Sequence, residues 1–409
     1  MKYIVVLADG MADEKIDILD DKTPLEYADT PYIDNLALYS EIGVVSTIPE
    51  GCTKGSDTAN LSVLGYNPQQ YYFGRSPLEA LSMGVALEDS DVTFRANLIT
   101  VSETEAGYED KVILDHSSDE ISTEEARELI LAVKEALGTE EKIFYPGISY
   151  RHLLVWKEGS RQVKLTPPHD ILEQRIGDYK PVGDHSDELW GLMKKSYEIL
   201  KDHPINKARK MQGLKPANSI WIWGEGIKPQ LPCFREKYGV KGAVISAVDL
   251  IKGIGIGAGM TSIDVEGATG NLHTNYEGKK AAALKFLLED HGDFVYIHLE
   301  GPDECGHRNE MANKVLAIEY IDSKIIGPVT KALKEAGEDY RLLVLPDHPT
   351  PLRLRTHTAD PVPYMIYDST RESSFNKEHR YNETYAIKSG NHIENGYELM
   401  GYFLNPAKY

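Results

Sequence analysis

Aspartate and histidine side chains that can bind a metal ion follow apolar stretches at several places in the sequence. The apolar run 342–346 leads into Asp347 and His348, and the run 3–8 ends at Asp9. A buried strand cannot hide a charge cheaply, so each of these groups must be solvated, hydrogen-bonded or bound to an ion. Taken one at a time, each is better explained as an ordinary turn residue.

A further pair of ligand-type residues follows another predicted strand, 293–299. Asp303 and His307 are four residues apart, so on a helical turn they share a face and can bind one ion. His357 adds an imidazole after the Asp347-His348 pair. Together these oxygen and nitrogen ligands suit two divalent ions of the Mn²⁺ or Zn²⁺ kind. The predicted ligands are Asp9, Asp303, His307, Asp347, His348 and His357.

Ser56 is the candidate nucleophile. It follows a glycine-containing turn, 51–55, and opens a predicted helix, where the positive end of the helix dipole favours a phosphate group. A serine that only caps the helix is the alternative. Because no Ser-His-Asp signature lies nearby, the available activator is a metal ion that lowers the pKa of the hydroxyl. We therefore expect Ser56 both to attack and to contact a metal ion.

The order of the predicted elements indicates a mainly parallel sheet. Apolar strands alternate with predicted helices such as 278–290 and 313–337, with short loops between them. This order is typical of an α/β protein whose sheet is covered by helices on both faces. Functional groups in such sheets collect beyond the carboxyl ends of the strands, so Asp9 and Asp347 are expected to converge.

A change of composition near residue 88 marks the start of a predicted insertion. Within residues 89–184 the pattern predicts a strand, a helix and a second strand, which is enough for a small α+β domain. Residues 1–88 and 185–409 would then form the larger, discontinuous domain. Side chains of the insertion that can serve an anion site, or alternatively surface ion pairs, are Arg95, Arg151, His152 and the loop Pro167–Asp170.

The overall charge of the chain is strongly negative. Its 409 residues carry a formal net charge of −20, which argues against a nucleic-acid or anionic-membrane partner. The three cysteines form no CxxC pair, which fits reduced thiols. The sequence shows neither a signal peptide nor a membrane-spanning run, so we expect a cytoplasmic protein, and it indicates no particular oligomeric state.

In combination, these motifs resemble the cofactor-independent phosphoglycerate mutases of the archaeal type, within the alkaline phosphatase superfamily. The resemblance extends over nearly the whole chain, and implies an alkaline-phosphatase-like α/β domain interrupted by a smaller α+β domain. It also implies interconversion of 3-phosphoglycerate and 2-phosphoglycerate through a phosphoserine, without 2,3-bisphosphoglycerate, in glycolysis or gluconeogenesis. The motifs that carry it are Asp9-Gly10, Gly55–Ser62, Asp303-x-x-x-His307, Asp347-His348 and His357–Pro363.

The resemblance also implies roles for individual residues. Ser56 would be the nucleophile; Asp9, Asp347 and His348 would hold one ion, and Asp303, His307 and His357 the other. Two Mn²⁺ ions are expected, with Mg²⁺, Zn²⁺ and Co²⁺ as alternatives. The positions that would grip the glycerate are Arg95, Arg151, His169, Asp170 and Arg209.

The inserted domain is expected to act as a closing lid. A phosphoserine exposed to water would hydrolyse, and the enzyme would become a phosphatase. The lid would therefore keep water away while the phosphoryl group is on Ser56.

One position departs from part of the family. Asn60 stands where some archaeal members have histidine, and the asparagine form also occurs in relatives that resemble homoserine kinases. The alternative function is therefore phosphotransfer on the same scaffold, as in a homoserine kinase, or metal-dependent phosphate hydrolysis. A metal-stabilised binding protein without catalysis is the third hypothesis, which the Ser56 segment disfavours.

Overall fold

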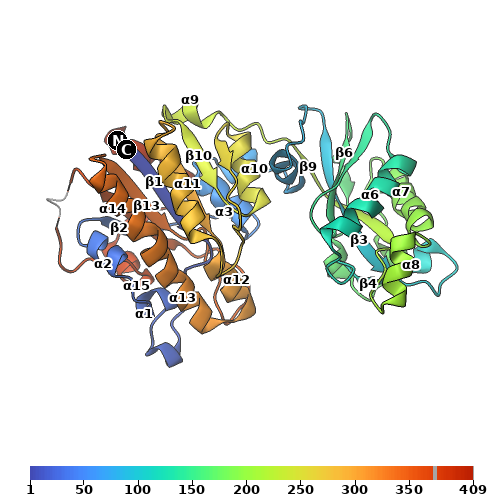
Figure 1. Cartoon of the computed structure of the whole chain (residues 1–409), viewed down its shortest axis with the longest axis horizontal. Coiled ribbons are helices and arrows are strands. Elements are labelled where there is room, and N and C mark those ends of the chain that lie inside the picture. Colours follow the sequence, from blue (N-terminus) through green and yellow to red (C-terminus); the bar gives the residue numbers. More distant parts are fainter. Residues whose placement is uncertain (372–374, 409) are drawn as a thin grey trace. The chain divides into compact units, whose positions relative to one another are not determined.

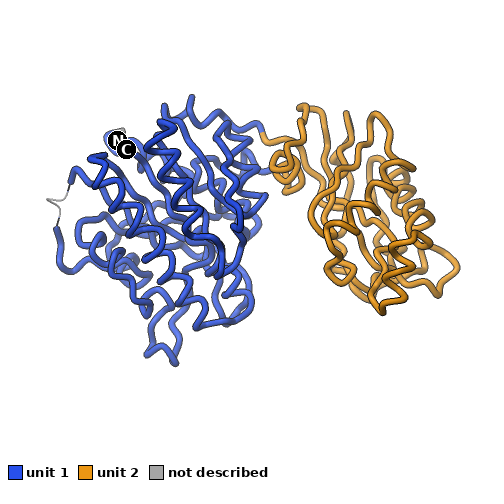
Figure 2. Tube along the Cα trace, viewed as in Figure 1, with its two compact units in different colours: residues 1–72, 230–409 blue, residues 73–229 orange. Residues whose placement is uncertain are grey.

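The computed structural model describes residues 1–371 and 375–408, and these form two compact units (Figures 1 and 2). Unit 1 comprises Met1–Tyr72 and Gln230–Tyr409, and unit 2 is the continuous segment Phe73–Pro229. The insertion predicted at residues 89–184 lies within unit 2, which extends beyond it at both ends. The insertion is wider because strand β9 (Ser219–Ile227) pairs antiparallel with β3 (Val92–Val101), and helix α7 (Ser186–Leu200) packs on β9.

Unit 1 is built on a sheet of eight strands in the order β11-β10-β12-β1-β13-β14-β2-β15. The neighbours from β11 through to β13 are parallel, whereas β14 runs antiparallel to both β13 and β2. The predicted mainly parallel sheet is confirmed. The strands are β1 (Lys2–Ala8), β2 (Glu41–Val45), β10 (Gly242–Ile245), β11 (Thr261–Ile263), β12 (Phe294–Leu299), β13 (Tyr340–Leu345), β14 (Val362–Asp368) and β15 (His392–Ile393).

Helices cover both faces of this sheet, as predicted for strands that are apolar along their whole length (Figure 1). The helix α13 continues through a π-helical turn, Asp322–Ile326, into α14. The helices of unit 1 are α1 (Pro24–Tyr27), α2 (Pro31–Ala37), α3 (Ser56–Val63), α4 (Pro68–Tyr71), α9 (Phe234–Tyr238), α10 (Asp249–Gly257), α11 (Tyr276–Leu288), α12 (Gly301–Arg308), α13 (Met311–Ile321), α14 (Gly327–Glu335), α15 (Glu383–Ser389) and α16 (Leu399–Leu404).

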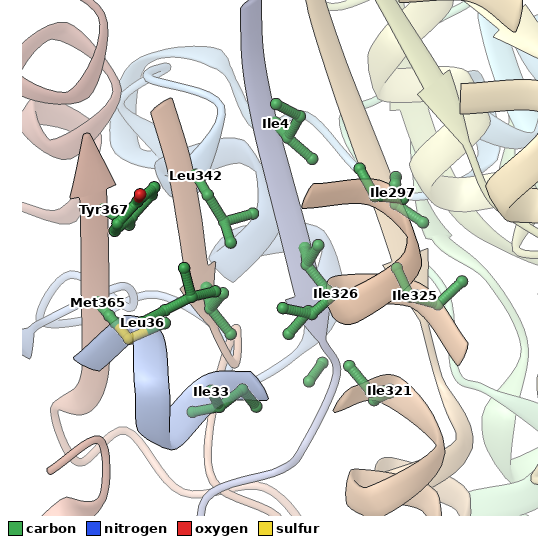
Figure 3. Close-up of a cluster of buried hydrophobic side chains, with 14 of the residues drawn as sticks. Ile4, Ile33, Leu36, Ile297, Ile321, Ile325, Ile326, Leu342, Met365 and Tyr367 are labelled. Atoms are coloured by element: carbon green, nitrogen blue, oxygen red, sulfur yellow. The ribbon is translucent and has the colours of Figure 1, made fainter. Parts of the chain in front are cut away.

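A large apolar cluster fills the space between one sheet face and the helices α2, α11, α13 and α14 (Figure 3). Alternate residues of each strand point into it, as the two-residue repeat of a strand requires. In β12 these are Val295, Ile297 and Leu299, so Tyr296 and His298 lie on the opposite face. Helix and strand residues that meet in Figure 3 include Ile33, Leu36, Ile321, Ile325, Ile326, Ile4, Leu342 and Met365.

The glycine-rich segment 253–259 belongs mostly to α10. A β-carbon on Gly255 would lie 2.7 Å from a methyl carbon of Val244 on β10. The glycine therefore allows α10 to lie close against the sheet.

Unit 2 is an α+β unit with its own core. Its strands β4, β3, β6 and β5, with β9 beside β3, form an antiparallel sheet, and α6 and α7 pack together beside it. Among the described residues, no helix is both long and apolar enough to cross a bilayer. The remaining elements of unit 2 are α5 (Ser76–Ser82), α6 (Thr123–Leu137), α8 (Pro204–Met211), β4 (Ile113–Asp115), β5 (Lys142–Tyr145), β6 (Arg151–Trp156), β7 (Val163–Lys164) and β8 (Val182–Gly183).

Candidate active site

The candidate site lies beyond the carboxyl ends of three adjacent parallel strands, β12, β1 and β13. Asp9 follows β1, Asp347 and His348 follow β13, and α12 begins directly after β12. Because parallel neighbours end at the same edge of a sheet, residues from distant parts of the sequence meet there. All six predicted ligands belong to two clusters at this edge.

The first cluster consists of Asp9, Asp347 and His348, all of them buried, with ligand atoms within 4.8 Å of one another. His348 Nε2 lies 3.7 Å from Asp9 Oδ1 and 3.4 Å from Asp347 Oδ2. Burial and the neighbouring carboxylates of Asp347 and Asp303 raise the pKa of Asp9 well above its usual value. Asp9 Oδ1 is buried and has no hydrogen-bond partner among the described residues. An oxygen in that situation suits coordination to a cation.

The second cluster consists of Asp303, His307 and His357. The Nε2 atoms of the two histidines lie 2.9 Å apart, at 3.2 Å (His307) and 3.4 Å (His357) from the Asp303 carboxylate oxygens. The Nδ1 atoms lie within hydrogen-bond distance of backbone carbonyls, that of His307 with Arg355 and that of His357 with Lys54. A carbonyl can only accept, so each Nδ1 carries the proton and each Nε2 can offer a lone pair to a metal ion.

The charges in the second cluster are strongly coupled. A hydrogen bond to the Asp303 carboxylate raises the pKa of His307 to about 9. Burial would raise the pKa of Asp303, but its contacts with His307 and His357 outweigh burial and hold that pKa low. Without a metal ion, protonated imidazole supplies the positive charge beside the Asp303 carboxylate. A bound divalent ion can supply that charge instead.

Two contacts join the clusters into one site. The rings of His348 and His357 stack with their centroids 3.9 Å apart. The hydroxyl of Thr350 donates to Asp303 Oδ1 and lies 3.3 Å from His348 Nδ1. Thr350 was not predicted as a site residue, although it lies two positions after His348.

Ser56 is the first residue of α3, as its predicted place at a helix start required. Its hydroxyl oxygen lies 3.1 Å from His348 Nε2, and therefore beside the first cluster. The structure thus brings Ser56 together with the six predicted ligands. Asn60, one turn further along α3, is fully buried and donates to both Asp347 Oδ2 and the Ser56 carbonyl, each at 2.8 Å.

Sequence reasoning missed two buried polar residues of β12. The Tyr296 hydroxyl donates to Asn60 Oδ1 at 2.6 Å, and His298 Nε2 lies 2.8 Å from Asp9 Oδ2. Burial lowers the pKa of His298 to about 3, so the ring is neutral. The available signal was the alternation of Tyr296 and His298 with aliphatic residues in an otherwise apolar strand.

The predicted glycerate-binding residues lie in unit 2, and two of them, Arg95 and His169, lie against the ring of Trp223. The Arg95 guanidinium lies 4.8 Å from the ring of Trp223 and also pairs with Glu79. The His169 ring lies 5.4 Å from the Trp223 ring, and Asp170 pairs with His169 at 3.7 Å. The position of Trp223 beside Arg95 and His169 follows from the tertiary structure.

The last two predicted residues, Arg151 and Arg209, differ in exposure. Arg151, the first residue of β6, is exposed and faces the ring of Tyr150 at 5.6 Å. Arg209, the other residue expected to grip the glycerate, is buried, and its guanidinium donates to Glu125 and to the carbonyls of Ser118 and Lys215. These bonds connect α8 with α6 and with the loops that carry Ser118 and Lys215.

Comparison with known proteins gives a consistent result. A family model described as 2,3-bisphosphoglycerate-independent phosphoglycerate mutase matches residues 37–206. A probable enzyme of that name from Geobacter sulfurreducens is 48% identical over 99% of this chain and 100% of its own. One from Methanosarcina barkeri is 48% identical over 98% of each chain.

Solved structures resemble the chain over its whole length. The PH0037 protein from Pyrococcus horikoshii aligns with a TM-score of 0.81 and 30% identity, covering 99% of this chain and 97% of that one. The cofactor-independent phosphoglycerate mutase from Thermoplasma acidophilum aligns with a TM-score of 0.68 and 26% identity, covering 100% of both chains.

Proposed function

The chain belongs to the family of 2,3-bisphosphoglycerate-independent phosphoglycerate mutases, and from this membership we propose that it acts through a phosphoserine at Ser56. As an isomerase of this family it interconverts 3-phosphoglycerate and 2-phosphoglycerate. The observation that carries the phosphoserine proposal is the Ser56 hydroxyl, at the first residue of α3 and 3.1 Å from His348 Nε2. We place this activity in the cytoplasm and in the central pathway between triose phosphates and pyruvate.

The donor atoms at the site fit two divalent ions, for which we propose Mn²⁺. Asp9, Asp347 and His348 would hold one ion, and the cluster of Asp303, His307 and His357 the other. Two observations support this assignment: Asp9 Oδ1 has no hydrogen-bond partner among the described residues, and the Nε2 atoms of His307 and His357 lie next to each other. When bound, the ions would neutralise the charge of the phosphoryl group and lower the pKa of the Ser56 hydroxyl.

The phosphoryl group is transferred first to Ser56 and then back to the glycerate. The Ser56 oxygen attacks phosphorus while the bond from phosphorus to the substrate oxygen breaks, and the serine proton ends on the hydroxyl that is released. The positive end of the α3 dipole favours the phosphoryl group at Ser56. The glycerate then attacks with its other hydroxyl, which regenerates Ser56 and yields the isomer.

We propose that unit 2 keeps water away from the phosphoserine and binds the glycerate. Arg95, Arg151 and His169 would bind its carboxylate and phosphate, and Asp170 would accept a hydrogen bond from a hydroxyl. A lid of this kind makes transfer to the second hydroxyl faster than hydrolysis of the phosphoserine. Arg209 is left out of this set because it is buried and its three nitrogens each already donate to a residue of unit 2.

The test is turnover of the purified, Mn²⁺-loaded protein on 3-phosphoglycerate, in the absence of 2,3-bisphosphoglycerate. We expect 2-phosphoglycerate to form with little free phosphate, and Ser56→Ala to abolish its formation. Release of phosphate without 2-phosphoglycerate would instead indicate a phosphatase. ATP with homoserine, tested in parallel, would give phosphohomoserine if the chain were a homoserine kinase.

Neither the relatives nor Asn60 favours the kinase alternative. The similar proteins carry the name of the mutase. The Asn60 side chain is fully buried and bonded to Tyr296, Asp347 and Ser56. Its residue type is therefore explained by contacts inside unit 1 and does not need a different substrate.

A further inference from the structure

We propose that Tyr296 and His298 of β12 are positioning residues, which fix the orientation of the Asp347 and Asp9 carboxylates of the first cluster. Tyr296 acts on Asp347 through Asn60, and His298 acts directly on Asp9. The proposal deepens the proposed function, since it rests on Asp9, Asp347 and His348 holding a metal ion. It assigns a function to two buried residues that the transfer reaction itself does not use.

Tyr296 and His298 are polar residues on a buried strand face where their strand neighbours are aliphatic. Tyr296 and His298 are two residues apart and share the face of β12 opposite the main apolar cluster. Both are fully buried, and their strand neighbours on β1 are Val5 and Leu7. An aliphatic residue would satisfy the sheet at either place, whereas a buried polar atom is costly unless it is hydrogen-bonded. Each polar atom must therefore have a partner that justifies it.

Tyr296 fixes the orientation of the Asn60 amide. Its hydroxyl donates to Asn60 Oδ1 at 2.6 Å, so the amide nitrogen points the other way, to Asp347 Oδ2 and the Ser56 carbonyl. A reversed amide would set its oxygen against both of those acceptors. One hydroxyl thus orients a ligand carboxylate and the first residue of α3 together.

Asp347 is held on its other side as well. Its Oδ1 accepts from the backbone N–H groups of Gly10 at 3.2 Å and of His348 at 2.9 Å. With Asn60 on Oδ2, the plane of the carboxylate has no freedom to rotate. Oriented ligands of this kind bind a metal ion with less loss of side-chain entropy.

His298 performs the same task for Asp9. A carboxylate can only accept, so His298 Nε2 carries the proton and donates to Asp9 Oδ2 at 2.8 Å. His298 Nδ1 then accepts from the Ser246 hydroxyl at 3.1 Å, and the Ser246 oxygen accepts the Val248 N–H at 2.9 Å. This chain of bonds occupies Oδ2 and leaves Oδ1, the buried atom without a partner, for the ion.

The chain offers a matched control for Tyr296. Tyr66 is also a fully buried tyrosine of unit 1, and its hydroxyl donates at 2.8 Å to an amide oxygen, the carbonyl of Pro232. Tyr296→Phe and Tyr66→Phe therefore remove the same group from similar surroundings. Only the first lies in contact with a residue that bonds to a predicted ligand.

The experiment is a calorimetric titration of Mn²⁺ into the metal-free full chain, for wild type, Tyr296→Phe and Tyr66→Phe. We expect Tyr296→Phe to weaken binding by about tenfold, the lower end of the effect of losing a direct partner of a metal ligand, because Tyr296 acts through Asn60, and Tyr66→Phe to leave it unchanged. Ser246→Ala, which releases the His298 ring, should weaken binding in the same sense. Thermal unfolding of the metal-free variants, compared between the two tyrosine changes, shows whether a loss of folding accounts for the difference.

A Tyr296→Phe variant that binds Mn²⁺ as tightly as wild type would overturn the proposal. Weakening of the same size in Tyr296→Phe and Tyr66→Phe would overturn it as well, because that result would point to a general loss of packing. The readout is metal binding and needs no turnover, so a failure of the phosphoserine mechanism would leave it interpretable. Conversely, if wild type binds no Mn²⁺, the metal assignment of the proposed function falls first.

Discussion

At the scale of single residues, Ser56 combines a reactive group with a position that no other described serine shares. It lies at the start of α3 and next to His348, which belongs to a ligand cluster. Helix position alone would give an ordinary cap, whereas helix position beside two clusters of carboxylates and imidazoles supports the proposed role of Ser56 as the nucleophile of phosphoryl transfer.

Ser56→Ala is expected to lower mutase turnover by about three orders of magnitude or more, because the proposed phosphoserine needs the hydroxyl that this change removes. The Mn²⁺ content, measured by elemental analysis, should stay close to that of wild type. Ser62→Ala is the control, since Ser62 is buried on the same helix and its hydroxyl has no partner among the described residues. Undiminished turnover of Ser56→Ala would exclude it as the nucleophile.

Asp303 is the residue on which the second cluster depends, because both of its imidazoles lie within ion-pair distance of its carboxylate. We expect Asp303→Ala to lower the bound metal in elemental analysis, and His307→Ala to do so as well. Glu289→Ala, at an exposed acidic residue after α11, controls for a general loss of negative charge. A full metal content in both cluster variants would remove these residues from the site.

At the scale of elements, the turns after the strands decide how closely the ligands approach. Gly10, directly after Asp9, has a φ of 63°, and a β-carbon there would lie 2.6 Å from atoms of Asp303 and Thr350. The turn therefore needs glycine for its backbone conformation and for the approach of α12 and the loop after β13. Residues of all three segments meet at that one position.

Gly10→Ala should consequently lower both Mn²⁺ affinity and turnover by at least about tenfold, since α12 must move to admit the methyl group. Gly337→Ala is the matched control, because Gly337 has a φ of 70° and nothing within 4 Å of the added carbon. It should cost only about 1 kcal/mol of stability and leave metal binding intact. Similar metal affinities in the two variants would contradict this account of the turn.

The start of α15 is tied to the segment after β1 through Glu383. Its carboxylate accepts from the Asp13 N–H at 3.1 Å and from the Thr23 hydroxyl at 2.7 Å. Asp13 in turn pairs with the fully buried Lys314 of α13, at 2.7 Å. This polar network connects the loop after β1 with α13 and α15.

Burial raises the pKa of Glu383 from 4.5 to about 7. Between these values the unfolded chain releases a proton that the folded chain keeps, so the contribution of Glu383 to stability is complete below pH 4.5 and is lost as the pH rises through about 7. In urea unfolding, Glu383→Gln should remove a loss of stability of about 3 kcal/mol over this range. An unchanged pH dependence in the variant would show that Glu383 does not titrate in this way.

At the scale of the whole molecule, the chain leaves unit 1 after Tyr72 and returns to it at Gln230. Unit 2 closes on itself between these points, since the Ile227 N–H donates to the Phe73 carbonyl at 3.3 Å. It also has an apolar core of its own, made from its sheet and the helices α6 and α7. These are the properties of a unit that can fold without the rest of the chain.

The segment 73–229, expressed alone, should therefore fold cooperatively, with the circular dichroism of an α+β protein and dispersed amide resonances. It should bind no Mn²⁺ with the affinity of the full chain, because all six predicted ligands lie in unit 1. A disordered spectrum would show that its core depends on unit 1.

The sequence by itself determined the types of the site residues and the ends of the elements that carry them. Asp9, Asp347 and the Asp303–His307 pair could be predicted because apolar strands are local patterns and the polar residue that ends each one is visible in the same few positions. Ser56 was predictable for the same reason, as a serine between a glycine turn and a helix. The parallel sheet then required their convergence.

Only the tertiary structure decided which residues support or surround those groups. The bond from Tyr296 to Asn60 joins positions 236 residues apart, and the bond from His298 to Asp9 joins positions 289 apart. The pairing of β9 with β3 likewise moved the border of unit 2, and the partners of Arg209 come from α6 and two loops. Such pairings depend on how whole elements pack, and no local pattern of residue types records them.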